Sequence, residues 1–455
     1  MNLRQYQTTA VAAIRDAYRR GVRRPLLVLP TGGGKTVIFS YITATAASRG
    51  KNVLVLVHRV ELLRQTSAKL SEFGVQHGMI NPQYKPRYHE SVQVASVQTV
   101  VKRLAHLTPP DLIVVDEAHH ASAGTWQKIL DAFPDALTLG VTATPVRADG
   151  KGLNDSFDEI VTGPTVRSLI DDGYLVQPRV FAPSTIDASA LHKRMGDFDK
   201  QEAAQMMDKP TITGDAVSHY MRLCDGQPAV AFCVTVEHAR HVAQEFRMRG
   251  YAAEAVDGAM DDADRKRILD GLGNGSVQVV CSCDLISEGT DIPAIACAIL
   301  LRPTMSEGLY IQQVGRALRT MDGKEHAIIL DHVGNVLRHG LPDMEREWSL
   351  EGKPKGKRKT SDEASLSVKQ CTKCFAVFAP APQCPECGAA VEMQGRKIEH
   401  VDGELTEITT VERKLKRMEV GQARTLDDLK RIASERGYKR GWVYHMAGLK
   451  GIDKK

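Results

Sequence analysis

The sequence lacks any long apolar run. Within its 455 residues no hydrophobic stretch approaches the roughly 20 residues that a helix needs to cross a bilayer. The first residues, from Met1 to Gln7, also lack the apolar stretch of a secretory signal peptide. Neither a membrane protein nor a secreted protein is therefore expected. We expect a cytoplasmic location, in which thiols stay reduced.

The sequence also has little net charge, +5, but that charge is unevenly placed. Residues 411–455 hold 13 Lys and Arg against 6 Asp and Glu, and residues 346–370 hold 7 against 4. A basic tail on a slightly acidic body is typical of a nucleic-acid-binding arm. A solvated tail without a partner has the same composition, so both interpretations stay open.

Internal repeats are absent, but one pattern occurs twice: short apolar runs alternate with amphipathic stretches. The expected strands are 26–29, 53–57, 92–95, 112–115 and 137–141 in the first block, and 229–234, 277–281, 295–301 and 327–330 in the second. The expected helices between them are 35–49, 60–73, 236–249, 261–272 and 306–320. This alternation predicts two tandem α/β domains, each a parallel sheet with helices on both faces.

The expected domain limits follow from this pattern and from changes in composition. They are a first domain at 1–175, a connector at 176–225, a second domain at 226–345, a basic linker at 346–370, a cysteine segment at 371–390, a linker at 391–423 and a basic helical tail at 424–455.

A glycine-rich segment, Pro30–Thr36, follows an apolar strand and precedes a helix. Gly32, Gly33 and Gly34 would let backbone N–H groups converge on a phosphate at the positive end of that helix. Lys35 would reach the β- and γ-phosphates of ATP, and the hydroxyl of Thr36 would bind Mg²⁺. The strict pattern has a glycine where this chain has Leu29. A strand-end turn without a ligand is the alternative.

Two acidic residues, Asp116 and Glu117, end the strand at 112–115, about 80 residues later. Asp116 could hold Mg²⁺ and Glu117 could polarise the attacking water, although acidic pairs also cap helices. Thr142 and Thr144 close the next strand, from which they could hydrogen-bond the segment that ends at His119. The neighbouring His120 is expected to face solvent.

In the second block Arg316 and Arg319 share one helix face at a spacing of three residues. Two guanidinium groups presented together could stabilise the charge that develops on a transferred phosphoryl group. An exposed basic face with surface ion pairs is the alternative. Upstream, residues 288–291 interrupt an apolar stretch with a glycine and polar groups, as a ligand-contacting loop would.

Through residues 1–340 these motifs, in this order, resemble the superfamily 2 helicases of the DEAD/DEAH type, which have two RecA-like domains. The resemblance implies that the nucleotide also contacts Gln7, at the adenine, and Gly289, Asp291 and Gln312. It implies that the nucleic-acid backbone contacts His58, Arg59, Ser96, Gln98, Thr99 and Thr290. It further implies that His119, Thr142 and Thr144 couple the two activities.

The runs 301–313 and 329–335 are similar to RadD-type bacterial repair helicases and their phage relatives. The family resemblance implies DNA as the track, with 3′→5′ movement. The expected partners are single-stranded or forked DNA and replication or repair proteins. Two alternatives stay open. One is a duplex translocase or remodeller that does not separate strands, and the other is a zinc-dependent DNA-binding adaptor with an inactive ATPase fold.

Four of the nine cysteines form two C-x₂-C pairs within seventeen residues, namely Cys371, Cys374, Cys384 and Cys387. Four thiolates at this spacing predict a zinc ribbon, and the zinc would be structural because protein fills all four positions. Disulfides and an iron–sulfur cluster are the alternatives. Further on, residues 437–445 interleave aromatic and basic side chains. That segment could stack bases, or it could be a small helical unit with Trp442 and Tyr444 as its core.

Overall fold

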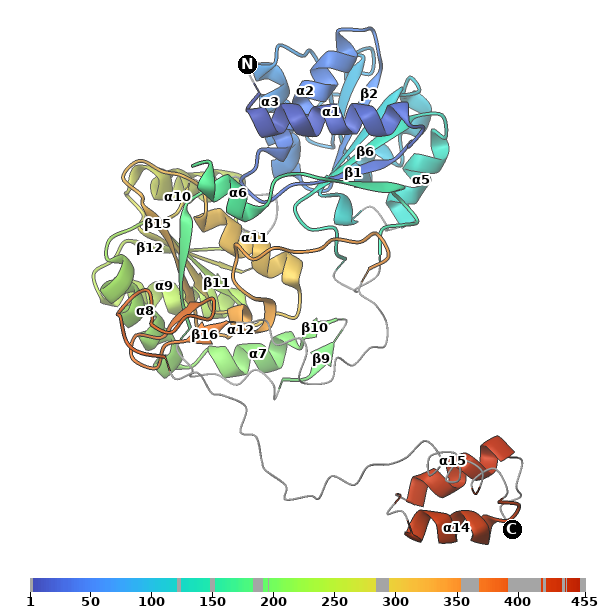
Figure 1. Cartoon of the computed structure of the whole chain (residues 1–455). Helices are drawn as coiled ribbons and strands as arrows, with labels where there is room; N and C mark the ends of the chain where they lie inside the picture. The colour runs from blue at the N-terminus through green and yellow to red at the C-terminus, as the bar shows by residue number, and fades with distance from the viewer. Residues whose placement is uncertain are drawn as a thin grey trace. The chain divides into compact units, whose positions relative to one another are not determined.

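The computed structural model describes residues 3–120, 124–147, 152–182, 191–194, 196–283, 294–352, 368–391, 419, 423–435, 438 and 440–450. The chain divides into two compact units, residues 1–392 and residues 393–455 (Figure 1). None of the helices in these ranges combines the length and the apolar character that a membrane span requires.

The first sheet has seven parallel strands in the order β3-β4-β2-β5-β6-β1-β7. Its strands are β1 Pro25–Val28, β2 Val53–Val57, β3 Gly78–Ile80, β4 Val92–Ser96, β5 Leu112–Asp116, β6 Leu137–Thr142 and β7 Glu159–Thr162. The helices are α1 Gln5–Arg19, α2 Lys35–Ala47, α3 Val60–Glu72, α4 Val97–Val100 and α5 Gly124–Ala132, with short 3₁₀ turns η1 Leu104–His106 and η2 Ala118–His120.

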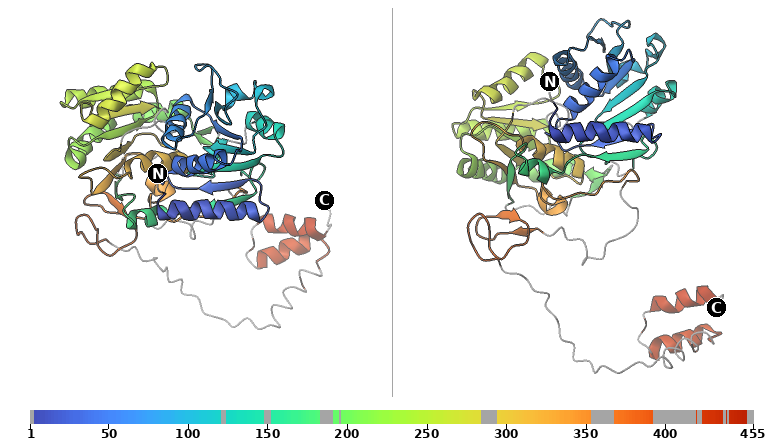
Figure 2. Two further views of the ribbon diagram at one scale, coloured as in Figure 1. Left: turned by 90° about the horizontal axis from the view of Figure 1, so that it is seen from above. Right: turned by 45° about the horizontal axis from the view of Figure 1, so that its top comes forward.

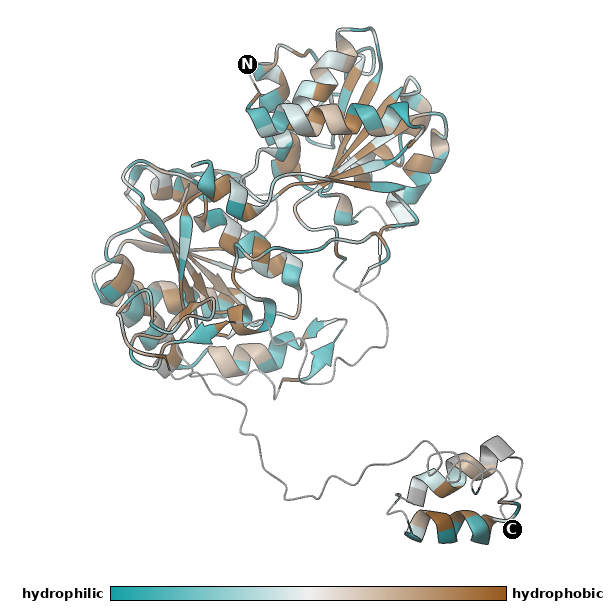
Figure 3. Ribbon diagram, viewed as in Figure 1, coloured by the Kyte–Doolittle hydropathy of each residue, from teal (hydrophilic) through white to brown (hydrophobic). Residues whose placement is uncertain are grey.

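Alternate residues of β2 enter two separate hydrophobic clusters. Val53 and Val55 pack in the cluster that also contains residues of α1, α2 and α3, whereas Leu54 and Leu56 pack in the one that contains residues of α4 and α5. Because successive strand residues point to opposite faces, both faces of the sheet are covered. The apolar strands stand out in Figure 3. The expected fold class is confirmed.

The second sheet has eight strands in the order β12-β13-β11-β14-β15-β8-β17-β16, parallel from β12 to β8. They are β8 Gln177–Phe181, β11 Ala229–Cys233, β12 Ala253–Val256, β13 Val279–Cys283, β14 Cys297–Leu300, β15 His326–Asp331, β16 Lys369–Gln370 and β17 Ala376–Phe378. Its helices are α6 Val166–Asp171, α7 Lys200–Met207, α8 Pro210–Cys224, α9 Val236–Met248, α10 Asp262–Asn274, α11 Glu307–Ala317 and α12 Asn335–His339. A separate hairpin pairs β9 Lys193–Arg194 with β10 Asp197–Phe198.

Segments outside the repeated pattern complete this second sheet. β8 comes from the segment expected as a connector, and it pairs with β15 on one side. On its other side it pairs with β17, which belongs to the cysteine segment. Two hydrogen bonds extend this junction, from the N–H of Ala182 to the carbonyl of Phe375 and from the amide of Gln370 to the carbonyl of Ala182. The cysteine segment is thus part of the second sheet's edge. The domain limits stay a prediction.

Residues 341–352, which we call the return segment, run from the second sheet back to the first (orange in Figure 1; Figure 2 gives two further views). Near its start Arg346 forms an ion pair with Glu307 at the beginning of α11, 2.9 Å from Nε to Oε1. Further on, the carbonyl of Leu350 accepts a 2.7 Å hydrogen bond from the N–H of Leu153. Trp348 and Leu350 pack against the first-sheet cluster around Phe157. The return segment therefore bonds to both sheets.

The second unit contains two helices, α14 Leu426–Glu435 and α15 Arg440–Lys450. Leu429 and Ile432 from the first pack with Val443 and Ala447 from the second. Trp442 packs at the margin of this core, whereas Tyr444 is 50% exposed. The expected helical tail is confirmed, and its core is formed by Val443 instead of Tyr444.

Candidate active site

The glycine-rich segment lies where β1 ends and α2 begins. Gly32 and Gly34 have φ values of 87° and 79°, a left-handed conformation that favours glycine. A Cβ on Gly34 would lie 2.6 Å from Nε2 of Gln7. Lys35 is the first residue of α2, so the positive end of that helix and the lysine lie at the same place. These features fit a phosphate ligand.

The start of α1 lies against this loop. The hydroxyl of Tyr6 donates a 2.9 Å hydrogen bond to the carbonyl of Gly33, and Gln7 is 4% exposed beside Gly34. The predicted adenine contact is thus next to the loop. Tyr6 was missed by sequence reasoning, because a single tyrosine in an amphipathic helix carries no distinctive signal.

The two acidic residues lie at the carboxyl end of β5. Asp116 is 4% exposed, and its Oδ1 accepts a 2.9 Å hydrogen bond from the N–H of Glu117. Glu117 has a φ of 47°, a conformation rare for a residue with a side chain and frequent at functional sites. Burial, and then the charge of Glu117, raise the pKa of Asp116 to about 7, against the opposing charge of Lys35. A buried carboxyl group beside a second carboxyl group fits a divalent cation.

The predicted coupling residues form a hydrogen-bonded chain. Nδ1 of His119 lies 3.1 Å from Oγ1 of Thr142, which donates a 3.0 Å hydrogen bond to the carbonyl of Thr144. A Cβ on Gly308 in α11 would lie 3.0 Å from Oγ1 of Thr144. Because Nδ1 of His119 also lies 3.5 Å from Oε2 of Glu117, these residues lie between the acidic pair and α11. His120 does not face solvent as expected: it is half-buried, with its ring 4.5 Å from that of His58.

Helix α11 forms the opposite wall of one cleft of 810 Å³, which is also lined by Lys35, Thr36, Asp116 and Glu117. From α11 and the residues after it, Gln312, Arg316 and Arg319 line this wall. Arg316 is only 7% exposed, so it does not lie on an exposed basic face. A Cβ on Gly315 would lie 2.6 Å from Cβ of Thr31, which means that only a glycine lets α11 approach the phosphate loop this closely.

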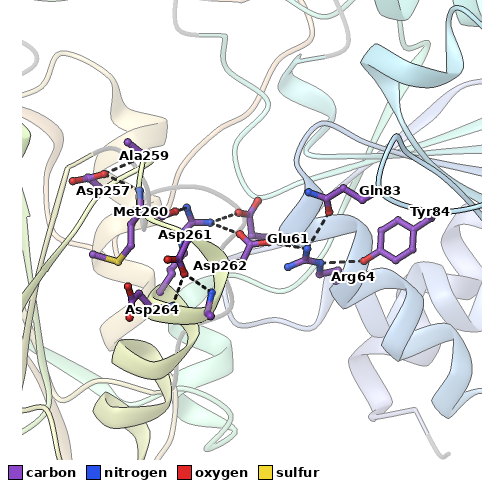
Figure 4. Close-up of polar contacts among 12 residues, drawn as sticks. Glu61, Arg64, Gln83, Tyr84, Asp257, Ala259, Met260, Asp261, Asp262 and Asp264 are labelled. Carbon is purple, nitrogen blue, oxygen red and sulfur yellow. Dashed lines mark hydrogen bonds and ion pairs between the residues drawn. The ribbon is translucent and has the colours of Figure 1, made fainter.

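Two ion pairs join α3 to α10 across the same cleft (Figure 4). Nη1 of Arg265 lies 2.7 Å from Oε1 of Glu61, and Nη2 of Arg64 lies 2.8 Å from Oδ2 of Asp262. The partners are 204 and 198 residues apart in the sequence. Sequence reasoning missed them because nothing local in one sequence pairs charges at such a separation.

The described residues among the predicted nucleic-acid contacts lie at the carboxyl ends of β2 and β4. Nε2 of Gln98 donates a 3.3 Å hydrogen bond to the carbonyl of His58, which precedes Arg59. Ser96 and Thr99 are buried and hydrogen-bond each other at 2.8 Å, whereas Gln98 is exposed. The predicted residues Gly289, Thr290 and Asp291 lie outside the residues that the structure describes.

The four paired cysteines converge on one point, with all Sγ atoms within 4.8 Å of one another. The Sγ atoms of Cys371 and Cys387 are 3.6 Å apart, as are those of Cys374 and Cys384. A disulfide would require about 2.05 Å. Tetrahedral zinc, with bonds of about 2.3 Å to sulfur, places sulfur atoms about 3.8 Å apart. The four residues fit a zinc ion. Glu386, which lies between Cys384 and Cys387 in the sequence, forms an ion pair with Arg179 of β8.

Two stretches of the chain match known protein families. Residues 1–147 match the family described as "Type III restriction enzyme, res subunit", and residues 215–321 match "Helicase conserved C-terminal domain". A 51.5 kDa protein of a Lactococcus phage is 36% identical over 362 residues, covering 79% of this chain and 76% of that protein.

The putative ATP-dependent helicase IRC3 of Saccharomyces cerevisiae is 32% identical over 355 residues. That match covers 73% of this chain and 51% of IRC3, so the chain spans about half the length of this relative. Among solved structures, a fragment of a putative HsdR subunit of a type I restriction enzyme from Vibrio vulnificus has a TM-score of 0.60 and 24% identity. It covers 77% of this chain and 67% of the fragment, and it shows the same fold.

Proposed function

The chain belongs to superfamily 2 of the helicases, the ATP-hydrolysing nucleic-acid translocases, and on that premise we propose that it is a DNA motor acting in repair, recombination or replication. The observation that carries the proposal is the single cleft lined by Lys35 and Asp116 from one sheet and by Arg316 and Arg319 from the other. A cleft built this way changes shape whenever its nucleotide changes, and that change moves the two sheets against each other.

Each wall of the cleft takes one part of the reaction. The loop amides and Lys35 would bind the β- and γ-phosphates, with Gln7 beside the base. Thr36 and Asp116 would hold Mg²⁺, which supplies positive charge to the phosphates. Glu117 would orient and polarise the attacking water, while Arg316 and Arg319 stabilise the charge that develops in the transition state.

Coupling would run through the series of contacting side chains from Glu117 and His119 to Thr142 and Thr144. Because Gly308 of α11 closely approaches Thr144, a shift at the γ-phosphate reaches the helix that carries Arg316 and leads to Arg319. The same shift reaches the second sheet, on which α11 packs. We expect hydrolysis to step the motor 3′→5′ along one DNA strand. His58, Arg59 and Gln98 would lie near the phosphate backbone of that strand.

The test is the Lys35→Ala variant of the full chain. We expect DNA-stimulated ATP hydrolysis to fall about a hundredfold or more, because the charge that stabilises the transferred phosphoryl group is lost. Lys128→Ala, which removes one exposed lysine from α5, serves as the matched control and should keep the wild-type rate. Stimulated hydrolysis that survives in Lys35→Ala would refute the assignment of the site.

Translocation on duplex DNA without strand separation is the second candidate. It is favoured by the match of residues 1–147 to a restriction-enzyme family. Displacement of a labelled strand from a fork, measured beside displacement of a triplex-forming strand from duplex, separates the candidates. Triplex displacement without fork unwinding would select the second. The adaptor with an inactive ATPase is set aside, since the chain belongs to an ATP-hydrolysing superfamily.

The cysteine cluster would hold a structural zinc ion. All four ligand positions are filled by protein, so none is left for a substrate. The ribbon would then secure β8, the last parallel strand of the second sheet, with which its own strand β17 pairs. Metal content, measured on the purified chain, tests this with an expected value near one zinc per chain.

A further inference from the structure

A second cavity, of 370 Å³, lies beside the second sheet. One wall is formed by Val234, Arg302 and Pro303, which follow the carboxyl ends of β11 and β14. The other wall is formed by the β9–β10 hairpin and the first residues of α7. In open α/β sheets, ligands bind in crevices outside the carboxyl ends of the strands, and this cavity has that position.

The base of the hairpin is fixed to the second sheet's domain. Oδ2 of Asp197 accepts a 2.9 Å hydrogen bond from the hydroxyl of Thr304, and Oδ1 accepts a 2.6 Å bond from the N–H of Met305. Phe198 is 7% exposed, and the guanidinium of Arg338 lies 5.0 Å from its ring. β9, which pairs with β10, is therefore attached to the second sheet's domain through Asp197 and Phe198.

The cavity presents more positive charge than its composition suggests. Arg194, Lys200 and Arg302 line it together with Asp197 and Asp199. Both acids already accept backbone N–H groups: Asp197 as described, and Asp199 as the cap of α7 through the N–H groups of Gln201 and Glu202. Their charge is thus partly neutralised by fixed dipoles.

Two basic side chains of β9 extend from this support. Lys193 and Arg194 are both exposed, and the side chain of Arg194 keeps 79% of its surface accessible. Nη1 of Arg194 lies 3.9 Å from Oδ2 of Asp199, at the limit of ion pairing. An exposed ion pair this long contributes little, so a phosphate could displace it.

We propose that the β9–β10 hairpin and this cavity bind the phosphodiester backbone of the nucleic-acid strand. The inference rests on the proposed function, and it adds a contact that lies outside the helicase motifs. Arg194 and Arg302, which line the cavity, bind phosphates there, and Lys193, on the other face of β9, binds a phosphate beside the cavity. Such contacts position the strand without reading its sequence.

A nucleic-acid strand is a better ligand for this site than an acidic protein, because the hairpin is hydrogen-bonded to the segment that leads into α11. The residues that Asp197 holds, Thr304 and Met305, lead directly to Ser306, which caps α11 by accepting the N–H of Leu309 at 3.2 Å. α11 carries Arg316 into the ATP cleft. A strand bound at the hairpin is therefore connected to ATP turnover, as a motor's track must be.

The experiment uses the full chain with Lys193→Ala and Arg194→Ala combined. Binding of a fluorescein-labelled single-stranded 20-mer is followed by anisotropy between 50 and 200 mM salt. Each phosphate contact on a single strand contributes about 0.7 to the slope of log affinity against log salt. We expect a slope smaller by about 1.4, a roughly tenfold loss of affinity and unchanged ATP hydrolysis without DNA.

Two variants are matched controls. Arg15→Ala with Arg19→Ala removes the same charge from the exposed side of α1 and should keep the wild-type slope. Lys193→Arg with Arg194→Lys keeps the charge and should keep most of the affinity. An independent measurement is photo-crosslinking of a 5-iodouracil strand to the unaltered chain, which should label the peptide containing residues 193–194.

Each other outcome overturns the proposal in a recognisable way. If the variant with Lys193→Ala and Arg194→Ala shows the same slope of log affinity against log salt as the α1 control, and the crosslink lies elsewhere, the hairpin is not a nucleic-acid site. If the unaltered chain binds no DNA, the hairpin proposal falls with the proposed DNA track. If ATP hydrolysis without DNA is lost in the alanine pair but not in the α1 control, the hairpin supports the fold of the ATP cleft and is not a separate contact.

Discussion

The two sheets are built differently, although their alternating patterns look alike. The first draws all seven strands from one continuous stretch, from β1 to β7, and carries the phosphate loop and the acidic pair. In the second sheet, β8 precedes helices α7 and α8 in the sequence, and β16 and β17 come from the cysteine segment. We conclude that the first sheet's half of the proposed ATP site depends on local sequence, whereas the arginine half depends on remote segments. Four predictions test this difference.

The largest effect is expected for Arg319→Ala. Turnover should fall about a thousandfold, because a guanidinium that stabilises the transition state is lost, while ATP affinity changes only a few-fold. Single-turnover hydrolysis and binding of a fluorescent nucleotide measure the two quantities. Arg319→Lys should restore little, since a single ammonium group does not reproduce the planar fork. Loss of ATP binding to the same extent as turnover would mean that the arginine is structural.

Loss of the proposed zinc ion is expected to weaken the second sheet and spare the first. Cys374→Ser with Cys384→Ser should speed hydrogen exchange about a hundredfold in β8 and β17, because metal-binding energy stabilises the fold to which the ligands belong. Exchange in β1 and β5 should stay at the wild-type rate. Mass spectrometry of peptides from both sheets measures this. Uniform change in both sheets, or none in β8, would contradict the difference between them.

Mild acid should also affect the second sheet. Burial lowers the pKa of His238 to about 4 and that of His332 to about 3, the latter also through the nearby His219. Their unfolded values are near 6.5, so the unfolded chain binds more protons below that pH. The stability that the neutral rings provide is complete above pH 6.5. It is lost as pH falls, by about 2 kcal/mol for each histidine between pH 6.5 and 5.

Urea unfolding at pH 7 and pH 5 measures the free energy of unfolding. Hydrogen exchange of the amides in β15 and β11 then tests whether the loss lies in the second sheet. His332→Phe keeps the ring that stacks 5.1 Å from His219 but cannot bind a proton. It should reduce by about half the loss of unfolding free energy between pH 7 and pH 5. The same pH dependence in this variant as in the wild type would assign the effect to other groups.

The smallest effect is expected at the return segment. Trp348→Ala removes apolar contact from the first-sheet cluster, and we expect a loss of about 1–2 kcal/mol in that sheet's unfolding free energy, since the side chain is only half-buried. Leu337→Ala, at a side chain 48% exposed on α12, is the control and should change little. A loss in the second sheet instead would mean that the segment belongs to that sheet alone.

Much of the fold could be predicted from the sequence because its signals are local. Apolar runs such as Val53–Val57 are buried strands, and glycine with lysine after β1 indicates a phosphate loop wherever it occurs. The arginine pair was predicted to share one helix face, but α11 ends at Ala317, so only Arg316 lies on the helix and Arg319 follows it. That Arg316 is buried against the loop was not predictable, because it depends on Gly315 fitting against Thr31 from the other sheet.

The sequence by itself determined the two α/β blocks, the ATP-binding motifs and the four clustered cysteines, since each rests on residues close together in the chain. Only the tertiary structure decided what joins them. It placed β17 beside β8, paired Arg265 with Glu61, returned Trp348 to the first sheet and attached the hairpin to the residues before α11. These contacts are set by packing between segments far apart in the chain, and no local periodicity or motif encodes such packing.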